Sequence, residues 1–487
     1  MSSTPPGGRS RRLALVLLCA GMMMIILDGT IVTVALPAVQ SDLGLSASGL
    51  AWVVNAYLIA FGGLLLLAGR LGDLVGRKRV FLAGLALFTL ASLLCGLATT
   101  PAMLIAARFA QGVGGALASA VSLGMIVLLF PEPRERMRAI GAYSFVGAAG
   151  ASLGLVAGGV LTDALGWHWI FFVNVPIGVL AGTLAARVLV ADRGIGLGRG
   201  ADVLGALLVT GGLMIGVYAI VETERHGWTS ARTLGTGALS LALLAAFVLR
   251  QSRAAQPLLP LRVFRSRNVS GANLVQALVV AGMFGFQFVM ALYLQRVLGY
   301  EAARTGWAMF PIAAVIGVLT LFVTARLIAR FGARAVLAAG LLLIAAGLTL
   351  LTQVPEDARY VPDLLVPMML AAAGAGLALP SMAGLGMSGA TEQDSGVVSG
   401  LFNTTQQIGA ALGSATLLTL AAGRADGLRA QGESAAAALT GGYHLAFGIG
   451  AGLAALALIV ALAVLRTEPA APTLQPQPEP EPRRVGA

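Results

Sequence analysis

Long apolar runs alternate with short polar segments along almost the whole chain. A helix that crosses a bilayer needs about 20 predominantly apolar residues, and fourteen runs in this sequence come close to that length or exceed it. They cover residues 13–37, 48–68, 80–98, 102–130, 138–162, 167–190, 202–221, 232–250, 270–295, 304–325, 335–352, 362–384, 397–421 and 443–465. The pattern predicts an all-α polytopic membrane protein with fourteen transmembrane helices.

The composition supports this fold class. Of 487 residues, 57% are hydrophobic and 11% are charged, whereas a soluble globular protein carries roughly a quarter charged residues. The first run, 13–37, is long enough to span and has no small-residue cleavage site, so we expect a retained helix rather than a signal peptide. Cys19 and Cys95 both lie inside apolar runs, so no disulfide framework is predicted.

The net charge of +11 would suit a nucleic-acid-binding protein, but the distribution of basic residues excludes that class. They recur in short loops on alternate sides of the apolar runs, and the larger share falls on the side of the N-terminus. Such an excess marks cytoplasmic loops, and an even helix count places both termini there. Together with the arginine-, alanine- and glycine-rich composition, this predicts a multi-pass protein of a bacterial inner (plasma) membrane.

A weak internal repeat predicts the domain organisation. Residues 325–334 align with 69–78 and keep the arginine, the leucine and the last glycine, while Ala329 replaces Asp73. Each copy follows the second helix of a half, which indicates two six-helix bundles with two further helices between them. The expected parts are a cytoplasmic N-terminus (1–12), a first bundle (13–190), an inserted helix pair (202–250), a cytoplasmic linker (251–269), a second bundle (270–465) and a disordered cytoplasmic tail (466–487). Repeat-built transporters bind substrate near mid-membrane between the repeats.

Two charged residues lie deep inside apolar runs, away from the ends. Asp28 is deep in the first run, where a charge costs about 2.5–3.5 kcal/mol, and burial favours the protonated carboxyl. Counting about 1.5 Å per residue from the same face, Asp28 is about 14 Å deep and Arg108 about 9 Å deep in an antiparallel helix. We expect each to lower the cost of the other, so that protonation of Asp28 leaves Arg108 uncompensated. The alternatives are a packing acid hydrogen-bonded to Thr30 and a purely structural ion pair.

Several uncharged polar residues also fall inside the runs. They are candidates to line a cavity, or they form hydrogen bonds between helices: Asn55, Gln111, Gln276, Gln287, Asn403, Gln406 and Gln407. Gln111 follows Arg108 by about one helical turn and joins the proton-coupling candidates. Glu222, near the outer end of its run, is either a second proton site or an interfacial acid.

Glycines recur every four residues in the fifth run, at Gly150, Gly154 and Gly158, with Gly159 beside them. Small residues on one face let helices pack closely. The repeat predicts either simple close packing or a hinge between the two halves.

Several motifs resemble the fourteen-helix drug:proton antiporters of the major facilitator superfamily. They are the charged loop 69–81, the first-helix segment 27–37 (LDGTIVTVALP), the fourth-helix segment 108–115 (RFAQGVGG), the fifth-helix segment 150–159 (GASLGLVAGG) and the segment 167–178 (WHWIFFVNVPIG), with weaker similarity at 293–299 and 403–409. Together they cover most of the chain. Four residues depart from the pattern: Thr33 stands where asparagine is usual, Leu155 where proline is usual, and His168 and Gln406 where arginine is frequent.

The resemblance implies roles for these positions. Asp28 would exchange protons or meet a cationic substrate, with Arg108 tuning it. A cytoplasmic gate would be formed by Gly69, Asp73, Gly76, Arg77 and Lys78, and the fifth-helix glycines would provide antiporter-specific packing.

The leading hypothesis is therefore a proton-coupled antiporter that exports hydrophobic or amphipathic drugs or antibiotics, of cationic character, by alternating access. Its partners would be that small molecule, protons and the lipid bilayer; we expect a monomer without cofactor, metal or nucleic acid. Alternatives are a dedicated exporter of an endogenous metabolite, lipid or siderophore, a membrane-embedded enzyme, and a transporter-shaped sensor. An enzyme is disfavoured because His168, His226 and His444 are far apart in sequence, and ATP-driven pumping because no GxxxxGK[ST] loop occurs.

Overall fold

The computed structural model describes most of the chain. Described are residues 8–130, 132–189, 192, 194, 196, 202–254, 257–388 and 395–466. Most of the expected tail, from residue 467, therefore lies outside the described residues, as do residues 1–7 of the expected N-terminus.

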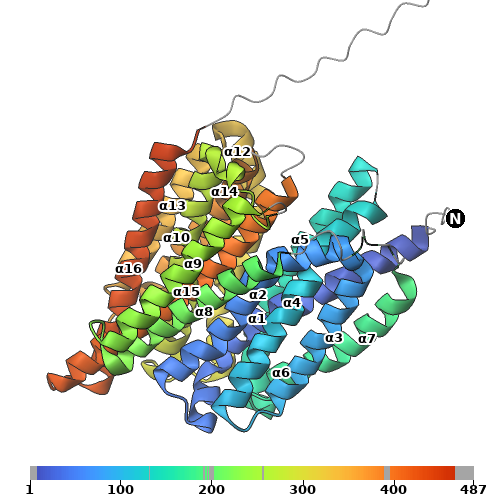
Figure 1. The fold of residues 1–487 in the computed structure, drawn as a ribbon. Helices are drawn as coiled ribbons and strands as arrows, with labels where there is room; N and C mark the ends of the chain where they lie inside the picture. Colours follow the sequence, from blue (N-terminus) through green and yellow to red (C-terminus); the bar gives the residue numbers. More distant parts are fainter. Residues whose placement is uncertain are drawn as a thin grey trace, which may run out of the picture.

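The described residues are almost entirely helical (Figure 1). The elements are α1 (Gly8–Leu43), α2 (Ala47–Val75), α3 (Arg77–Gly96), α4 (Pro101–Leu129), α5 (Pro133–Leu165), α6 (Trp169–Phe172), α7 (Asn174–Val188), α8 (Val203–His226), α9 (Ala231–Arg253), the 3-10 turn η2 (Leu261–Arg265), α10 (Arg267–Arg296), α11 (Ala302–Val318), the π-helical η3 (Leu319–Val323), α12 (Thr324–Phe331), α13 (Ala333–Leu351), the π-helical η4 (Tyr360–Leu365), α14 (Val366–Ser388), α15 (Ser395–Ala430) and α16 (Ala435–Val464).

Local sequence explains where several helices begin and end. The side chains of Ser46, Thr100 and Ser230 accept a hydrogen bond from the backbone amide three residues on, which satisfies one of the unpaired donors of a helix N-terminus. Gly76 and Gly332 separate α2 from α3 and α12 from α13, with φ of 108° and 82°, a region that favours glycine. These are the last glycines of the two aligned segments, so the sequence repeat is also a repeat of local structure.

Judged by the length and composition of its helices, the structure contains fewer membrane spans than the sequence predicts. Among the described residues, twelve helices are long and apolar enough to cross a membrane. α2 passes only as a pair, Gly49–Leu65 and Leu67–Val75, bent by 50°, which raises the number to thirteen. In α5 the apolar helix is the shorter Leu153–Leu165. All fourteen apolar runs are occupied by helices, but a count of fourteen spans is not reached.

The helices form two packed groups (Figure 1). In the first, α1 packs against α5 and α7, and α4 packs against α2 and α3. In the second, α10 packs against α15 and α16, and α13 packs against α14 and α16. The groups meet where α2 contacts α15 and where α5 contacts α11.

The pair α8 and α9 lies along this junction (Figure 1). α8 packs against α9 and also against α2 and α15, one helix from each group. Asp202 closes the hairpin: its carboxylate accepts hydrogen bonds from Gly205 N (2.9 Å), Arg250 Nε (2.5 Å) and Gln251 Nε2 (2.7 Å). The pair therefore contacts both groups and is fastened at one end.

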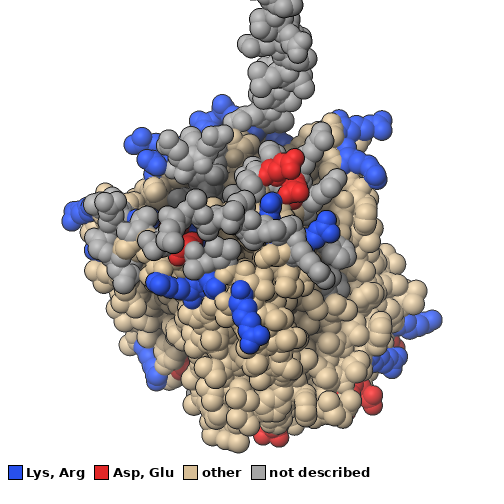
Figure 2. Space-filling view, turned by 90° about the vertical axis from the view of Figure 1, so that its right-hand side faces the viewer, with Lys and Arg blue, Asp and Glu red and all other residues tan. Residues whose placement is uncertain are grey.

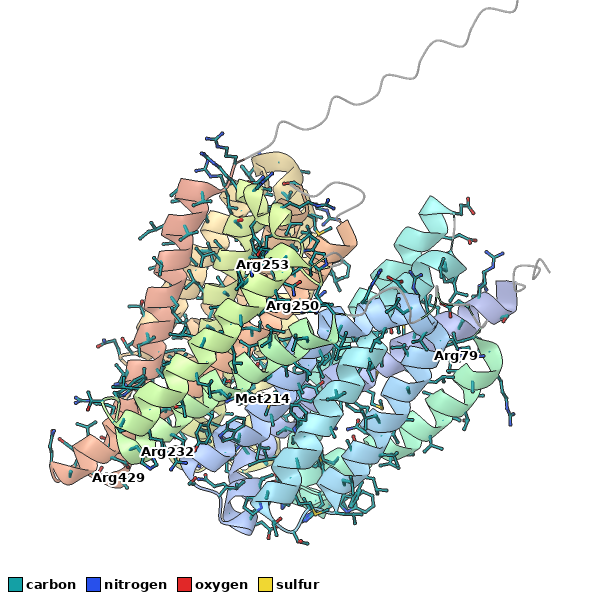
Figure 3. All side chains as sticks on the ribbon, in the orientation of Figure 1. Arg79, Met214, Arg232, Arg250, Arg253 and Arg429 are labelled. Atoms are coloured by element: carbon teal, nitrogen blue, oxygen red, sulfur yellow. The ribbon has the colours of Figure 1, made fainter. Side chains whose placement is uncertain are left out.

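We name the two ends of the molecule after the helix connections that lie there. The α2–α3 end contains Gly76, and Arg79, Arg250 and Arg253 lie towards it, whereas Arg232 and Arg429 lie at the opposite α1–α2 end (Figure 3). Lys and Arg side chains gather over the upper part of the face shown in Figure 2, above a wide surface with few charges. This is the arrangement expected of a protein with a lipid-facing belt.

Candidate functional site

Asp28 and Arg108 form a buried ion pair in the first group of helices. Arg108 Nη1 donates to Asp28 Oδ2 at 2.5 Å and to Gln111 Oε1 at 2.6 Å. Asp28 Oδ1 accepts from Gln111 Nε2 at 2.7 Å and from Asn174 Nδ2 at 2.9 Å. Gln111 Nε2 also lies 2.7 Å from Ser92 Oγ. The network thus joins α1, α3, α4 and α7.

The guanidinium of Arg108 is held on its other sides as well. Its Nε donates to the backbone carbonyl of Val53 at 3.0 Å, and its Cζ lies 4.3 Å from the ring centroid of Tyr57. Phe171 approaches the same group at 5.8 Å. A planar guanidinium with five donors suits a site that combines several hydrogen bonds with aromatic contacts.

Both charged side chains are withdrawn from solvent: Asp28 is 0% exposed and Arg108 is 1% exposed. An unpaired buried charge costs several kcal/mol, so each group is tolerated because the other is present. The local reason for the geometry is simple. Arg108 and Gln111 are three residues apart on α4, so both side chains leave the same face of the helix and reach one carboxylate from two directions.

A cavity of about 300 Å³ lies beside this network, between the two groups of helices. Its walls come from α1, α2, α4, α5, α10, α11, α14 and α15. Arg108 belongs to the wall, whereas Asp28 lies behind it and is not a lining residue. Arg108 therefore links the buried carboxylate to a space large enough for a small molecule.

The structure separates the polar candidates into two sets. Gln287, Gln406 and Gln407 line the cavity. Asn55, Gln276 and Asn403 are not among the described lining residues. Asn55 Oδ1 accepts from Ser414 Oγ at 2.9 Å, which ties α2 to α15, and Gln276 Nε2 donates to the carbonyl of Phe402 at 3.3 Å, which ties α10 to α15.

Glu222 lies elsewhere, on α8. Its Oε2 is 3.3 Å from His226 Nδ1, one turn further along the helix. Among the described residues it is not part of the cavity wall, and its ion-pair partner is His226 rather than Arg108.

The charged loop after α2 is tied to the first half of the chain. Asp73 Oδ1 lies 3.0 Å from Arg77 Nη2, and Arg77 Nη1 donates to the carbonyl of Gly124 at 3.3 Å. Lys78 Nζ donates to the carbonyls of Ala186 and Leu189 at 2.8 and 2.6 Å.

Asp192 adds a cap to this loop that sequence reasoning missed. Its carboxylate accepts from the backbone amides of Arg77 (2.8 Å) and Lys78 (3.2 Å), where the helix dipole favours an anion. A Cβ on Gly76 would lie 2.7 Å from the Asp192 carbonyl oxygen, whereas one on Gly69 would meet nothing within 4 Å. Within the described residues, these partners of Arg77 and Lys78 all precede residue 193.

The glycines of α5 lie at two helix contacts. A Cβ on Gly154 would come within 2.0 Å of Thr30 Oγ1, and one on Gly158 within 2.4 Å of the carbonyl oxygen of Ile31, both on α1. Gly150 faces α1 less tightly, at 3.4 Å from the carbonyl oxygen of Met23. A Cβ on Gly159 would lie 2.4 Å from the carbonyl oxygen of Ala302, so this glycine faces α11 in the other group.

Sequence reasoning also missed partners inside the ion-pair network. Asn174 is a fully buried amide within the segment that resembles the family pattern, and a single polar residue amid apolar neighbours was its signal. Tyr57 and the carbonyl of Val53 gave no comparable signal, because their contribution depends on how α2 is rotated against α4.

Comparisons with known proteins agree with this architecture. The sequence profile described as Major Facilitator Superfamily matches residues 18–414. The chain is 39% identical over 464 residues to the puromycin resistance protein pur8 of Streptomyces alboniger, covering 94% of this chain and 92% of that protein. It is 42% identical over 409 residues to the cephamycin export protein CmcT of Amycolatopsis lactamdurans, covering 84% of each.

Among solved structures, a bacterial homolog to the human lysosomal transporter Spinster, crystallised in an inward-facing and unoccupied conformation, matches with a TM-score of 0.66. The match covers 94% of this chain and 97% of that one. At 17% identity this likeness shows the fold alone.

Proposed function

Because the chain belongs to the major facilitator superfamily, we propose that it is a proton-coupled antiporter that exports hydrophobic or amphipathic small molecules. Its relatives are named for antibiotic resistance and export, and we extend antibiotic export to this protein. The observation that carries the proposal is the buried Asp28–Arg108 pair, whose arginine reaches the wall of a cavity between the two halves.

Proton exchange at Asp28 would change the charge of the cavity wall. With Asp28 ionised, the pair is neutral and the carboxylate accepts from Arg108, Gln111 and Asn174. A proton on Asp28 removes that compensation and leaves the guanidinium of Arg108 as a net positive charge at the wall. Since an uncompensated buried charge costs about 3–5 kcal/mol, protonation would favour another conformation in which Arg108 is rearranged or solvated.

Contacts at the α1–α2 end support alternating access. Gln295 Nε2 of α10 donates to the carbonyl of Val34 in α1 at 2.9 Å. Asp163 of α5 accepts from the backbone amides of Ala302 (3.2 Å) and Ala303 (2.6 Å), at the start of α11. These contacts join the halves at this end, whereas the partners given above for Arg77 and Lys78 at the other end stay within one half. The structure is thus interpreted as a state closed at the α1–α2 end.

The arrangement in the membrane follows from the charges. We propose that the α2–α3 end faces the cytoplasm of a bacterium, which makes the state inward-facing and the loop around Asp73 a cytoplasmic gate. The proposed topology keeps fourteen spans in the inner membrane, with α2 and α5 completing the count and α8 and α9 as the inserted pair.

The test is transport by purified protein in vesicles with an imposed pH gradient, measured with ethidium and with an uncharged dansyl dye. The expected result is gradient-dependent movement of at least one dye by the wild type, lost in Asp28→Asn and retained in Asp426→Asn, whose carboxylate is exposed in α15. Movement that survives both collapse of the gradient and the Asp28 substitution would contradict the proposal.

An exporter dedicated to one metabolite of the same cell shares this fold and this coupling. The name of the cephamycin export protein makes such a narrow role a second candidate. A panel of unrelated dyes distinguishes a dedicated exporter from a multidrug exporter. A dedicated exporter would move few or none of the dyes while still exchanging protons for its own substrate.

A further inference from the structure

Three glutamine side chains on the cavity wall have carboxamides without a hydrogen-bond partner among the described residues. Gln287 comes from α10, and Gln406 and Gln407 come from α15. Asn55, Gln111 and Gln276 instead bond to protein groups, although Asn55 Nδ2 and Gln276 Oε1 have no partner among the described residues. All three glutamines are partly exposed at the cavity, so their unpaired carboxamides are available to a bound molecule.

The charge of the wall limits what that molecule can be. Arg108 is the one charged side chain among the described lining residues, and Asp28 balances it at 2.5 Å. A cationic substrate would therefore find no carboxylate on the wall. An anionic substrate would compete with Asp28 for a guanidinium whose Nε and Nη1 already donate to protein groups. The remaining wall is largely apolar and includes Met283, Phe284, Phe286, Phe288 and Met309.

We infer that the substrates are uncharged amphipathic molecules carrying amide, carbonyl or hydroxyl groups, and that Gln287, Gln406 and Gln407 determine this specificity. The inference rests on the proposed function and names the substrate class of the same cavity. A carboxamide both donates and accepts, so each glutamine can pair with any of these groups. A site built to hydrogen-bond its ligand rejects molecules that leave its polar groups unpaired. The sequence predicts a cationic substrate instead, and the dye comparison below distinguishes the two.

The glutamines are positioned by packing, and the space in front of them is kept open. A Cβ on Gly62 of α2 would lie 2.5 Å from the Cβ of Gln407, so α2 holds this part of α15 in place. Gly29 and Gly317 are also on the wall, and a Cβ on either would meet nothing within 4 Å. The cavity therefore has room for an apolar body beside the three carboxamides.

Equilibrium binding of three matched dyes tests the inference. The dyes share a dansyl sulfonamide and a five-carbon chain that ends in an amine (cationic), an N-acetylated amine (uncharged) or a carboxylate (anionic). With purified full-length protein in detergent at neutral pH, the uncharged dye is expected to bind at least about tenfold more tightly than either charged dye. This experiment contains no pH gradient. If the preference for the uncharged dye is absent, proton-coupled transport is not contradicted. If proton coupling is absent in vesicles, the binding preference is not contradicted.

Substitutions assign the preference to the glutamines. Each of Gln287→Leu, Gln406→Leu and Gln407→Leu is expected to weaken binding of the uncharged dye about two- to tenfold, whereas Gln353→Leu, outside the cavity wall and exposed, leaves it unchanged. The near-isosteric Gln407→Glu is expected to shift the preference towards the cationic dye, which a folding defect would not do. The inference is overturned if the uncharged dye binds no more tightly than the cationic one, or if the three leucine variants bind it as the wild type does.

Discussion

The guanidinium of Arg108 lies 2.5 Å from the carboxylate of Asp28, between helices whose contacting residues are 80 positions apart in sequence. Asp28 also accepts hydrogen bonds from Gln111 and Asn174, and Arg108 reaches the cavity wall. In the proposed function, this contact connects the proton site with the cavity that would hold a substrate. Its disruption should have effects on stability that depend on which partner is removed.

Arg108→Gln should destabilise the protein more than the double variant Asp28→Asn/Arg108→Gln. Removing one partner of a buried pair leaves the other charge uncompensated, at a cost of about 3–5 kcal/mol, while the double variant leaves no buried charge. Thermal unfolding in detergent measures the three variants as a double-mutant cycle. If the loss of stability in the double variant equals the sum of the losses in the two single variants, the pair is not energetically coupled.

Asp163→Ala should open the α1–α2 end. The substitution removes the carboxylate that accepts from Ala302 and Ala303 across the two halves. A loss of about 1 kcal/mol changes the ratio of closed to open states about fivefold. Spin labels at the exposed positions 164 and 356 report the distance across this end, and the native Cys19 and Cys95 are buried. Asp426→Ala is the matched control, and an unchanged distance distribution in Asp163→Ala would refute the role of this contact.

Gly159→Ala should weaken the packing of α5 on α11. The added Cβ would lie 2.4 Å from the carbonyl oxygen of Ala302, and overpacking of this kind costs about 1–3 kcal/mol. The expected results are a lower unfolding temperature and slower transport. Gly235→Ala in α9 adds the same methyl group where nothing lies within 4 Å, so equal effects of the two substitutions would contradict the proposed close contact.

Acid should loosen the α8–α9 hairpin through Asp202, which precedes the span Val203–Ile220. Burial acts to raise the pKa of this carboxyl, but hydrogen bonds from Arg250, Gln251 and the Gly205 amide hold the pKa below its usual value. A lowered folded-state pKa stabilises the fold above the unfolded pKa of about 4, and this contribution is lost as the pH falls through the folded value.

The stability difference between wild type and Asp202→Asn is therefore expected to be constant near neutral pH and to shrink below about pH 4. Thermal unfolding at a series of pH values measures it. A difference that stays constant through the acid range would show that the Asp202 carboxylate does not contribute through its charge.

The sequence predicts the helices well because a span must be long and apolar, and both properties are local. It does less well at their ends: α1 extends to Leu43 through Pro37. A proline within a membrane helix is tolerated where neighbouring groups donate a hydrogen bond to the freed carbonyl. The π-helical segments at 319–323 and 360–365 carry no local signal, since they depend on packing between helices.

The sequence places Asp28 and Arg108 near one level, because antiparallel helices bring residues of similar depth together. Depth does not reveal rotation about the helix axis. The sequence therefore could not separate Gln407, which faces the cavity, from Asn55, which bonds to Ser414. Asp192 was beyond prediction for another reason: it caps a helix more than 100 positions away in sequence.

The account depends on proton exchange at Asp28 that is coupled to substrate movement. The direct measurement is the internal pH of vesicles that contain the purified protein and a pH-sensitive dye, after a concentration gradient of the uncharged dansyl dye is imposed without a pH gradient. The account predicts that wild-type protein moves protons opposite to the dye, and that Asp28→Asn moves none. Dye movement by the wild type without any pH change, or an equal proton flux in Asp28→Asn, would contradict it.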